Sequence, residues 1–327
     1  MRPPRSILII KPSSLGDVVH TLPAVACVRR HWPEAKIRWL VNPEWAPVLE
    51  GNPDIDEAIE FPRAKFRGLT GWMRLPGWIR GLRERVQPDL VLDFQGLLRS
   101  ALIARGVGGE SWGTSDSREC ARFFHRKIVQ VPPRSDPVHA VRRYLALVAA
   151  LGCDITAPLE WRLPTGTRPA DCPDDFVVLH PFSRGEGKSL TADETATICR
   201  EVSTASRGVS TVKTVIAGRA DIALSPQPNI VNLLNRTTLP ELCWMVRRAK
   251  FVVSVDSGPM HIAAALTENL LSIHTWSDPR KVGPFAPDAW IWKDGKIGCM
   301  SDFPNGSPVP RSAIGRWLAE KIAEPAG

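Results

Sequence analysis

Short apolar runs alternate with longer amphipathic stretches along most of the chain. In the first half the apolar runs predict strands at residues 7–11, 37–41 and 90–94. The amphipathic stretches predict helices at residues 18–30, 72–86, 97–104 and 138–151. Such alternation is typical of βαβ units, which build a parallel sheet with helices on its faces. The first half therefore predicts an α/β domain.

The same alternation restarts after a stretch that lacks it. Residues 153–175 contain four prolines and no helical period, so they predict a linker. Beyond it, strands are predicted at residues 176–180, 212–217 and 251–255, and helices at 192–205, 239–247 and 313–322. We expect two Rossmann-like domains, residues 1–155 and 156–327, with a cleft between them at the carboxyl ends of the strands. Whether the C-terminal helix packs back on the first domain stays open.

Composition agrees with two globular domains. The chain has 327 residues, of which 43% are hydrophobic and 23% are charged. Its seven cysteines are scattered without a CxxC pair, which disfavours a disulfide framework or a zinc site and fits a reducing compartment. The first apolar run is too short for a signal peptide, and no run approaches the roughly 20 apolar residues that span a bilayer. We expect a soluble, cytoplasmic protein without a bound metal or cofactor.

The charge indicates an anionic partner. The formal net charge is +8, and seven basic residues lie between Arg63 and Arg85 against a single acid, Glu84, with Trp72 and Trp78 interleaved. A second basic run follows from Arg118. A solvated helix face explains one such stretch, whereas two in the same half favour an anionic ligand or a membrane surface. Nucleic acid is disfavoured, because no recognisable nucleic-acid-binding module is present.

Two strand-to-helix turns carry candidate chemistry. In KPSSLGD, which follows the first predicted strand, Gly16 permits a tight turn and Asp17 stands at the start of a helix. That carboxylate could act as a general base, or it could simply cap the helix. In the second turn, Ser257 as N-cap would let Gly258 open a helix whose free N–H groups favour a phosphate. His261 could bind the same anion or be structural.

Two common nucleotide motifs are absent. GEGKS at residues 185–189 lacks the first glycine of a P-loop, where Phe182 stands, so an NTPase is disfavoured. Lys188 in that segment is either a phosphate ligand or an ordinary surface lysine. No GxGxxG follows a strand, which disfavours a dinucleotide oxidoreductase. Asp93, after the third predicted strand, lines a cleft or caps a turn.

The motifs together resemble a known family. KPSSLGDVVHTLPA, VLDFQGLLRSA, SREC with FFHRK, HAVRR and VVSVDSGPMHIAAAL occur in order along nearly the whole chain. In this respect the chain resembles the ADP-heptose:lipopolysaccharide heptosyltransferases of glycosyltransferase family nine. The resemblance implies a GT-B fold, with two Rossmann-like domains facing a central cleft. It also implies an acceptor site in the N-terminal domain, a nucleotide-sugar site in the C-terminal domain, and inverting, metal-independent transfer.

The resemblance also implies roles for individual residues. Asp17 matches the catalytic base. The positions that match the donor site are Ser183, Arg184, Lys188, Asp221, Asp256, Ser257, Gly258 and His261. The positions that match the acceptor site are Ser14, Gly16, Arg63, Lys65, Arg67, Gln95 and Arg118.

Departures from the family pattern cluster in the donor half. Ser189 and Leu190 stand where the family usually has an aromatic residue and a proline. Ile222 stands where a glutamate usually contacts ribose, with Asp221 one position earlier. The usual GPTDP turn reads TWSDP at residues 275–279. These changes leave the donor's sugar and nucleotide open.

The sequence therefore predicts an inverting transfer of heptose from ADP-heptose to the lipopolysaccharide inner core, either Kdo-lipid A or heptosyl-Kdo. The reaction is expected at the cytoplasmic face of the inner membrane. One alternative is a family-nine enzyme with another sugar or acceptor. A second is a non-catalytic protein that binds anionic lipid or nucleic acid.

Overall fold

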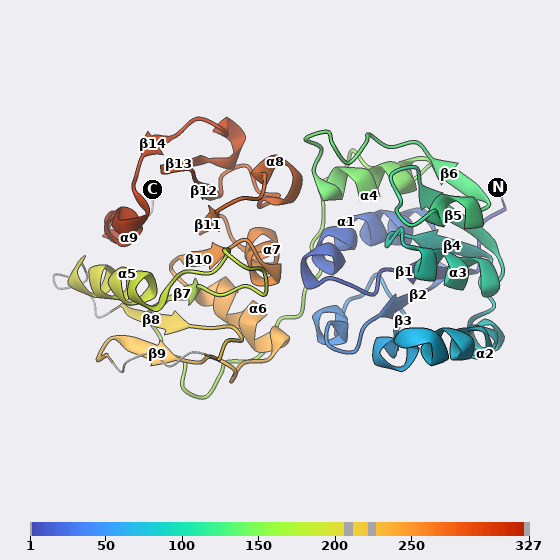
Figure 1. The fold of residues 1–327 in the computed structure, drawn as a ribbon, viewed down its shortest axis with the longest axis horizontal. Coiled ribbons are helices and arrows are strands. Elements are labelled where there is room, and N and C mark those ends of the chain that lie inside the picture. Colours follow the sequence, from blue (N-terminus) through green and yellow to red (C-terminus); the bar gives the residue numbers. More distant parts are fainter. Residues whose placement is uncertain (1, 206–211, 222–226, 324–327) are drawn as a thin grey trace. The chain divides into compact units, whose positions relative to one another are not determined.

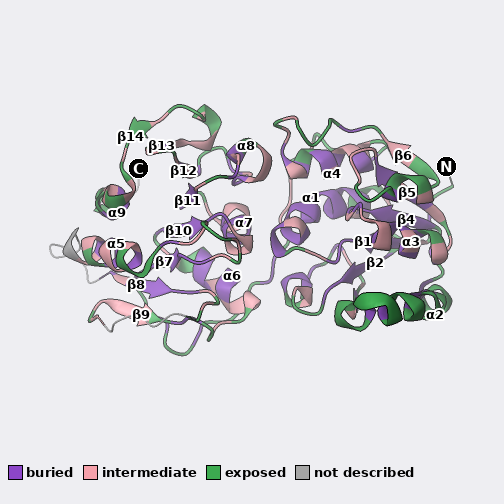
Figure 2. Ribbon diagram, viewed as in Figure 1, coloured by how far each residue is buried: buried purple, intermediate pink, exposed green. Residues whose placement is uncertain are grey.

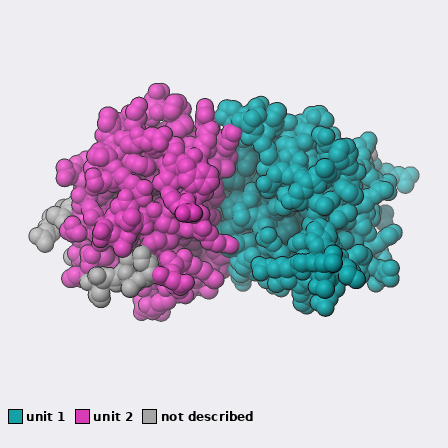
Figure 3. Space-filling model, viewed as in Figure 1, with its two compact units in different colours: residues 1–164 teal, residues 165–327 magenta. Residues whose placement is uncertain are grey.

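The computed structural model describes residues 2–205, 212–221 and 227–323. Its backbone contacts divide the chain into two compact units, residues 1–164 and 165–327 (Figure 3). The division falls inside the stretch 153–175 and somewhat after residue 155, where the sequence placed the domain boundary. Each unit is an α/β structure built on its own sheet (Figure 1). The predicted fold class is confirmed.

The sheet of the first unit is six-stranded and parallel, in the order β3-β2-β1-β4-β5-β6. Its strands are β1 (Ser6–Ile10), β2 (Lys36–Val41), β3 (Glu57–Glu60), β4 (Leu90–Asp93), β5 (Glu110–Thr114) and β6 (Lys127–Val129). The central strand β1 is wholly apolar after Ser6, as expected of a strand covered on both faces. Because β1 pairs with β4, the turns that follow these two strands are neighbours.

Helices cover the two faces of this sheet. They are α1 (Leu15–His31), α2 (Gly68–Val86), α3 (Leu98–Gly106) and α4 (Ala140–Ala149), with short 3-10 turns η1 (Ala46–Leu49), η2 (Arg63–Phe66) and η3 (Ala121–Phe124). Apolar side chains of α2 and α3, such as Ile79 and Ile103, pack with Leu8 and Ile10 of β1 in one core cluster. Helices α1 and α4 pack against each other. The helix α2 leaves most of its surface to solvent (Figure 2).

The sheet of the second unit has eight strands in the order β14-β13-β12-β11-β10-β7-β8-β9. The strands are β7 (Phe176–His180), β8 (Lys213–Ile216), β9 (Ile230–Asn232), β10 (Val252–Val255), β11 (Leu270–His274), β12 (Trp290–Lys293), β13 (Lys296–Cys299) and β14 (Ser307–Pro308). All neighbours are parallel except β12 with β13 and β13 with β14, which form an antiparallel edge. The central strands β7, β10 and β11 end beside one another, and the loops that follow them meet there.

The helices of this unit are α5 (Ala192–Ala205), α6 (Leu239–Arg248), α7 (Gly258–Leu266), α8 (Pro279–Val282) and α9 (Ile314–Ala323), with 3-10 turns η5 (Met300–Asp302) and η6 (Arg311–Ala313). The C-terminal helix α9 packs on α5. A Cβ on Gly315 would lie 2.9 Å from the Cα of Ile198, so glycine permits this close approach. Helix α9 thus packs against α5 within its own unit.

Element boundaries differ from the predicted ones mainly at helix starts. Helix α1 begins at Leu15, so Asp17 lies within its first turn. Helix α2 begins at Gly68 and contains Pro76. The strands that escaped prediction are β3, β5 and β6 of the first sheet and β9, β11, β12, β13 and β14 of the second. Most of them lie toward a sheet edge, whereas β11 is buried between β10 and β12. Edge strands are covered less than central ones, so their sequences carry a weaker apolar signal.

Within the described parts of the chain, no helix has the length and apolar character needed to cross a membrane.

Candidate functional sites at the strand ends of each unit

Asp17 is the acid of a helix-capping arrangement. Its Oδ2 accepts hydrogen bonds from the Ser14 backbone N–H at 3.0 Å and from the Ser14 hydroxyl at 2.7 Å. This is the geometry of a capping box, in which an acid at the third helical position satisfies a free N–H of the N-cap. The capping interpretation of Asp17 is thus correct for one of its two carboxylate oxygens.

The second oxygen of Asp17 faces a buried lysine and a half-buried tyrosine. The Tyr144 hydroxyl donates to Oδ1 at 3.1 Å, and the Lys11 ammonium lies 3.6 Å away. Lys11 also donates to the Phe94 carbonyl at 3.0 Å and lies 4.9 Å from the centre of the Tyr144 ring. About 38% of the Asp17 side chain is still exposed, so a solute can reach it.

These contacts fix the ionisation of the group. Burial alone would raise the pKa of Asp17, but the Lys11 cation and the hydrogen bonds from Ser14 and Tyr144 together lower it below its usual value. Burial and the nearby carboxylate raise the pKa of Tyr144 well above its usual value, so this hydroxyl remains a neutral donor. Asp17 is consequently an ionised acceptor over the whole neutral range.

The turn after β4 joins this site. Asp93 is buried, and its oxygens accept hydrogen bonds from Gln95 N, Gly96 N and the Ser100 hydroxyl, with His125 Nε2 at 3.2 Å. Asp93 therefore holds its own turn together, which is the capping alternative. Gln95 Oε1 accepts from the Ser13 N–H at 3.2 Å, so this side chain bridges the two turns.

The predicted acceptor residues fall into two groups. Ser14, Gly16 and Gln95 lie in the paired turns after β1 and β4, and the N–H of Arg118 donates to the Gly96 carbonyl at 2.8 Å in the same place. Arg63, Lys65 and Arg67 lie in and beside η2, and all three are exposed. Burial, followed by the charge of Arg63, lowers the pKa of Arg99, which places Arg63 near α3. Their acceptor role stays a prediction.

In the second unit the structure brings Lys188 to Asp256. Asp256 follows β10 and is 5% exposed, and Lys188 stands in the loop after β7. The ammonium donates to Asp256 Oδ2 at 2.6 Å. Burial would raise the pKa of Asp256, but the bonds from Lys188 and Ser277, and the neighbouring His274, lower it. Two residues 68 positions apart thus form one partly buried ion pair at the carboxyl ends of the central strands.

The N-terminus of α7 lies beside this pair. Ser257 is the N-cap and Pro259 lies in the first turn, as predicted. The Ser257 hydroxyl lies 3.3 Å from His180 Nδ1, and it accepts no hydrogen bond from the helix backbone. The first N–H groups of the helix are therefore left to other acceptors. Gly218 lies close to the same histidine, since a Cβ there would be 2.8 Å from Nε2. His261 is buried in α7.

The loop between β7 and α5 is closed by its own side chains. The Ser189 hydroxyl accepts a hydrogen bond from the Ser183 N–H at 3.0 Å and donates one to the Ser183 carbonyl at 3.2 Å. The serine that departs from the family pattern therefore shapes the turn that presents Lys188. Arg184 and Asp221 are exposed, and Ile222 lies outside the described residues.

Several residues at these sites were not predicted. Lys11 and Tyr144 hold Asp17, and Tyr144 is the only tyrosine in the chain, a signal that could have drawn attention to it. Trp276 follows β11 and is 65% exposed, with the Lys188 ammonium 4.6 Å from its ring centre. The available signal in the sequence was its place in TWSDP, one of the departures from the family pattern.

Buried histidines lie under the second site. His180 and His274 are both buried. His274 forms hydrogen bonds with the Ser272 hydroxyl at 2.7 Å and with the Ser277 hydroxyl at 2.9 Å. Burial lowers the pKa of each to about 4. Within residues 2–205, 212–221 and 227–323, no group of three or more His, Cys, Asp or Glu side chains could hold a metal ion.

Acidification is therefore expected to weaken the fold between pH 6.5 and 4. In this window the unfolded chain binds protons at His180 and His274, whereas the folded chain does not, so the stability that is full above pH 6.5 is lost as the pH falls to about 4. The loss should reach up to about 3 kcal/mol per histidine. Urea unfolding at several pH values measures it, and His180→Gln with His274→Gln should flatten the profile. The exposed His31→Gln is the control; equal pH slopes in the double variant and wild type would contradict the assignment.

Known proteins share both sequence and fold with this chain. Residues 202–312 match the model of glycosyltransferase family 9 (heptosyltransferase). The chain is 28% identical to lipopolysaccharide heptosyltransferase 1 of Escherichia coli K12, over 87% of this chain and 92% of the relative. It is 29% identical to lipopolysaccharide heptosyltransferase 1 of Salmonella typhimurium, over 85% of this chain and 91% of the relative.

Solved structures extend the comparison to the fold. The E. coli heptosyltransferase WaaC with ADP has a TM-score of 0.74 at 23% identity, covering 97% of this chain and 99% of that one. A family 9 glycosyl transferase from Veillonella parvula has a TM-score of 0.73 at 19% identity, covering 99% and 97%. At such identities the likeness shows the fold, which is the two-unit GT-B type that the motifs implied. The chain is thus similar to the lipopolysaccharide heptosyltransferases over most of its length and to glycosyltransferase family 9 over residues 202–312, and the resemblance that its motifs indicated is confirmed.

Proposed function

We propose that the protein transfers a heptose from ADP-heptose to the inner core of lipopolysaccharide with inversion at the anomeric carbon. The second unit would hold the donor, and the first unit would hold the acceptor, Kdo-lipid A or heptosyl-Kdo. Because such an acceptor is anchored by lipid, we place the reaction at the cytoplasmic face of the inner membrane. Relatives named lipopolysaccharide heptosyltransferases and a neighbour solved with ADP support this proposal.

The observation that carries the donor assignment is the Lys188–Asp256 pair beside the N-terminus of α7. An ammonium group and free helical N–H groups are the groups that bind a diphosphate. Asp256 holds the ammonium in place through a 2.6 Å bond, so Lys188 is already positioned before any anion arrives. Lys188, His261 and the N–H groups after Ser257 would stabilise the charge that develops on the departing diphosphate.

The acceptor would be activated by Asp17. As the acceptor hydroxyl oxygen bonds to the anomeric carbon, the bond from that carbon to the diphosphate oxygen breaks and the diphosphate keeps the electron pair. The hydroxyl proton passes to Asp17. A carboxylate with a lowered pKa is a weak base for a free alcohol, but the proton becomes acidic once its oxygen has bonded to carbon. Tyr144 and Lys11 would then keep the carboxylate oriented.

Binding of the donor tests the assignment of the second unit. Calorimetric titration with ADP-heptose, ADP and UDP should show that both adenine nucleotides bind more tightly than UDP. Binding and turnover should persist in excess EDTA, because Lys188 and the α7 N-terminus supply the positive charge. Preference for UDP, or turnover that returns only with added Mg²⁺ or Mn²⁺, would contradict this part of the proposal.

The acceptor assignment predicts a selective change in KM. Replacing Arg63, Lys65 and Arg67 by glutamine should raise the KM for the anionic acceptor, because the three exposed cations attract it. The ADP-heptose affinity should be retained, and stability should change by less than about 0.5 kcal/mol, as for most surface substitutions. Rising salt should reduce the advantage of the wild type, since exposed charges are screened beyond about 8 Å at physiological ionic strength. An unchanged acceptor KM at low salt would show that these three residues are ordinary solvated surface residues.

A further inference from the structure

Helix α2 has two apolar faces, and only one of them is used by the core. Leu75, Ile79, Leu82 and Val86 are buried against the sheet and α3. A second stripe at helical spacing faces solvent: Leu69 is 81% exposed, Met73 is 75% exposed, and Trp72 is 36% exposed. Among the described residues only six large apolar side chains are at least 36% exposed. Three of the six lie between residues 69 and 73. Such clustering indicates an interaction surface.

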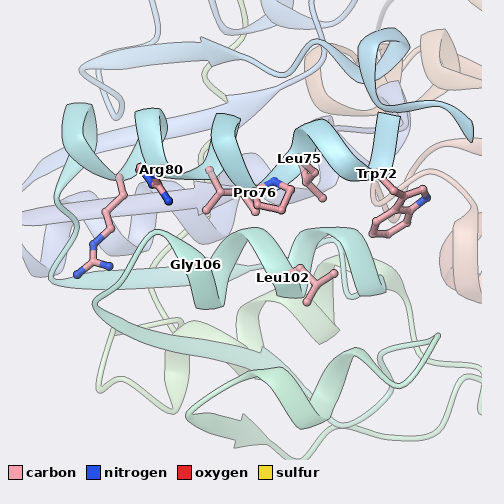
Figure 4. A pocket seen from close by; sticks show the side chains of 8 residues that line it. Trp72, Leu75, Pro76, Arg80, Leu102 and Gly106 are labelled. Atoms are coloured by element: carbon pink, nitrogen blue, oxygen red, sulfur yellow. The ribbon is translucent and has the colours of Figure 1, made fainter. Parts of the chain in front are cut away.

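A groove runs beside this stripe. It has a volume of about 370 Å³ and lies between α2 and α3, lined among others by Trp72, Leu75, Pro76, Leu102, Arg80 and Arg83 (Figure 4). Arg99 of α3 lies over the Trp72 ring, 4.9 Å from its centre. The two helices approach closely at Gly106, where a Cβ would lie 2.5 Å from the Ile79 side chain. The groove therefore has an apolar wall and two guanidinium groups on its α2 side.

Positive charge surrounds the stripe and the groove. Of the seven basic residues from Arg63 to Arg85, only Arg85 has an ion-pair partner, Glu57, in the described part of the chain. The remaining six cations lie on or next to α2 and form no ion pair with any residue that the structure describes. An apolar stripe within a cationic rim is complementary to an anionic lipid surface, where aliphatic side chains enter the acyl region and arginines reach the phosphates.

We propose that α2 and its groove dock the protein onto an anionic lipid bilayer. Leu69, Trp72 and Met73 enter the acyl region, and Arg80 and Arg83 bind a lipid phosphate at the groove. A second copy of the chain fits this surface poorly, because a symmetric dimer would place the same cations opposite one another. A nucleic acid would satisfy the cations but not the exposed aliphatic side chains. The inference rests on the proposed function in one respect: the lipid-anchored acceptor is the reason that the protein meets a membrane.

Vesicle binding tests the docking surface without donor or acceptor. The full chain is sedimented with phosphatidylcholine vesicles that contain or lack about one third phosphatidylglycerol, and it should bind the anionic vesicles far more strongly. Leu69→Ser with Met73→Ser should weaken this binding at least about tenfold. Arg80→Gln with Arg83→Gln should weaken it about 25-fold, since each cation near an anionic surface contributes about fivefold. Lys296→Gln with Arg316→Gln, two exposed cations of the second unit, is the charge-matched control and should bind like wild type.

Several outcomes would overturn the proposal. The first is that the Leu69→Ser, Met73→Ser variant binds vesicles as strongly as the wild type does. The second is that the arginine variant and its control lose the same amount of binding. The third is that the wild type binds neutral vesicles as strongly as anionic ones. Equally tight binding of a duplex oligonucleotide at the same salt would assign the surface to nucleic acid. If the arginine variant fails to fold, the serine variant still decides, because both of its positions are exposed. Turnover on a short, deacylated acceptor separates the two proposals: it should be unchanged in the serine variant, and its absence in wild type counts against the proposed reaction alone.

Discussion

Replacing Asp17 by asparagine is expected to lower kcat by about 10²–10⁴, the usual contribution of a positioned general base. Asparagine keeps an oxygen that can accept the Ser14 N–H, so the start of α1 should remain intact. Because the proposed donor site lies in the other unit, the affinity for ADP-heptose should stay within about threefold of wild type. Steady-state kinetics with the acceptor saturating, together with donor titration, measure both effects.

The structure offers a close control for this variant. Glu241 of α6 occupies the equivalent helical position and accepts from the Thr238 N–H at 2.8 Å and the Thr238 hydroxyl at 2.9 Å. Glu241→Gln therefore perturbs the same capping arrangement away from Lys11 and Tyr144, and it should leave kcat unchanged. If both variants lose the same activity, or if Asp17→Asn loses none, Asp17 is a capping residue and not the base.

The second large effect is expected at Lys188. Lys188→Met should lower kcat/KM by about 10²–10³, comparable to the loss of one preorganised group that stabilises developing negative charge. It should also weaken ADP binding, which the loss of a capping or surface residue would not do. In this variant Asp256 remains buried but loses its ammonium partner. The free energy of unfolding should therefore fall by about 1–3 kcal/mol.

Two further variants separate catalysis from stability. Lys250 forms an exposed pair with Asp175 at 3.3 Å in the same unit, and Lys250→Met should affect neither turnover nor ADP affinity. Adding Asp256→Asn to Lys188→Met should recover much of the lost stability, because no unpaired buried carboxylate remains, but it should not restore turnover. Restored turnover in the double variant would show that Lys188 acts only by neutralising Asp256.

The parts of the fold that the sequence predicted share a physical cause. Central strands such as β1, β7 and β10 are covered on both faces, so each appears as an apolar run bounded by polar turns. The start of α7 was predictable because Ser257 and Pro259 have strong positional preferences at helix N-termini. Edge strands such as β6 and β9 carry only three residues each, and no run of that length stands out from a loop.

The site was predictable only where its residues lie in the strand-end turns. Asp17 and Asp256 each stand shortly after an apolar run, and Lys188 stands in a loop after another, so their positions at strand ends followed from the sequence. Their partners did not: Tyr144 reaches Asp17 from a helix 127 positions away, and nothing local marks it except its rarity. The capping role of Asp17 and its possible role as a base stayed open because one carboxylate has two oxygens, and only the structure assigns one of them to Ser14.

The central claim is heptose transfer itself, and product analysis tests it most directly. The protein is incubated with ADP-heptose and either Kdo-lipid A or its heptosyl-Kdo counterpart, and the acceptor is examined by mass spectrometry and by NMR of the new anomeric centre. The account predicts that one of these acceptors gains a single heptosyl residue of inverted configuration, with one ADP released per transfer, and that Asp17→Asn does not form this product at a comparable rate. Release of ADP without sugar on either acceptor, transfer with retained configuration, or transfer only from a different nucleotide sugar would contradict it.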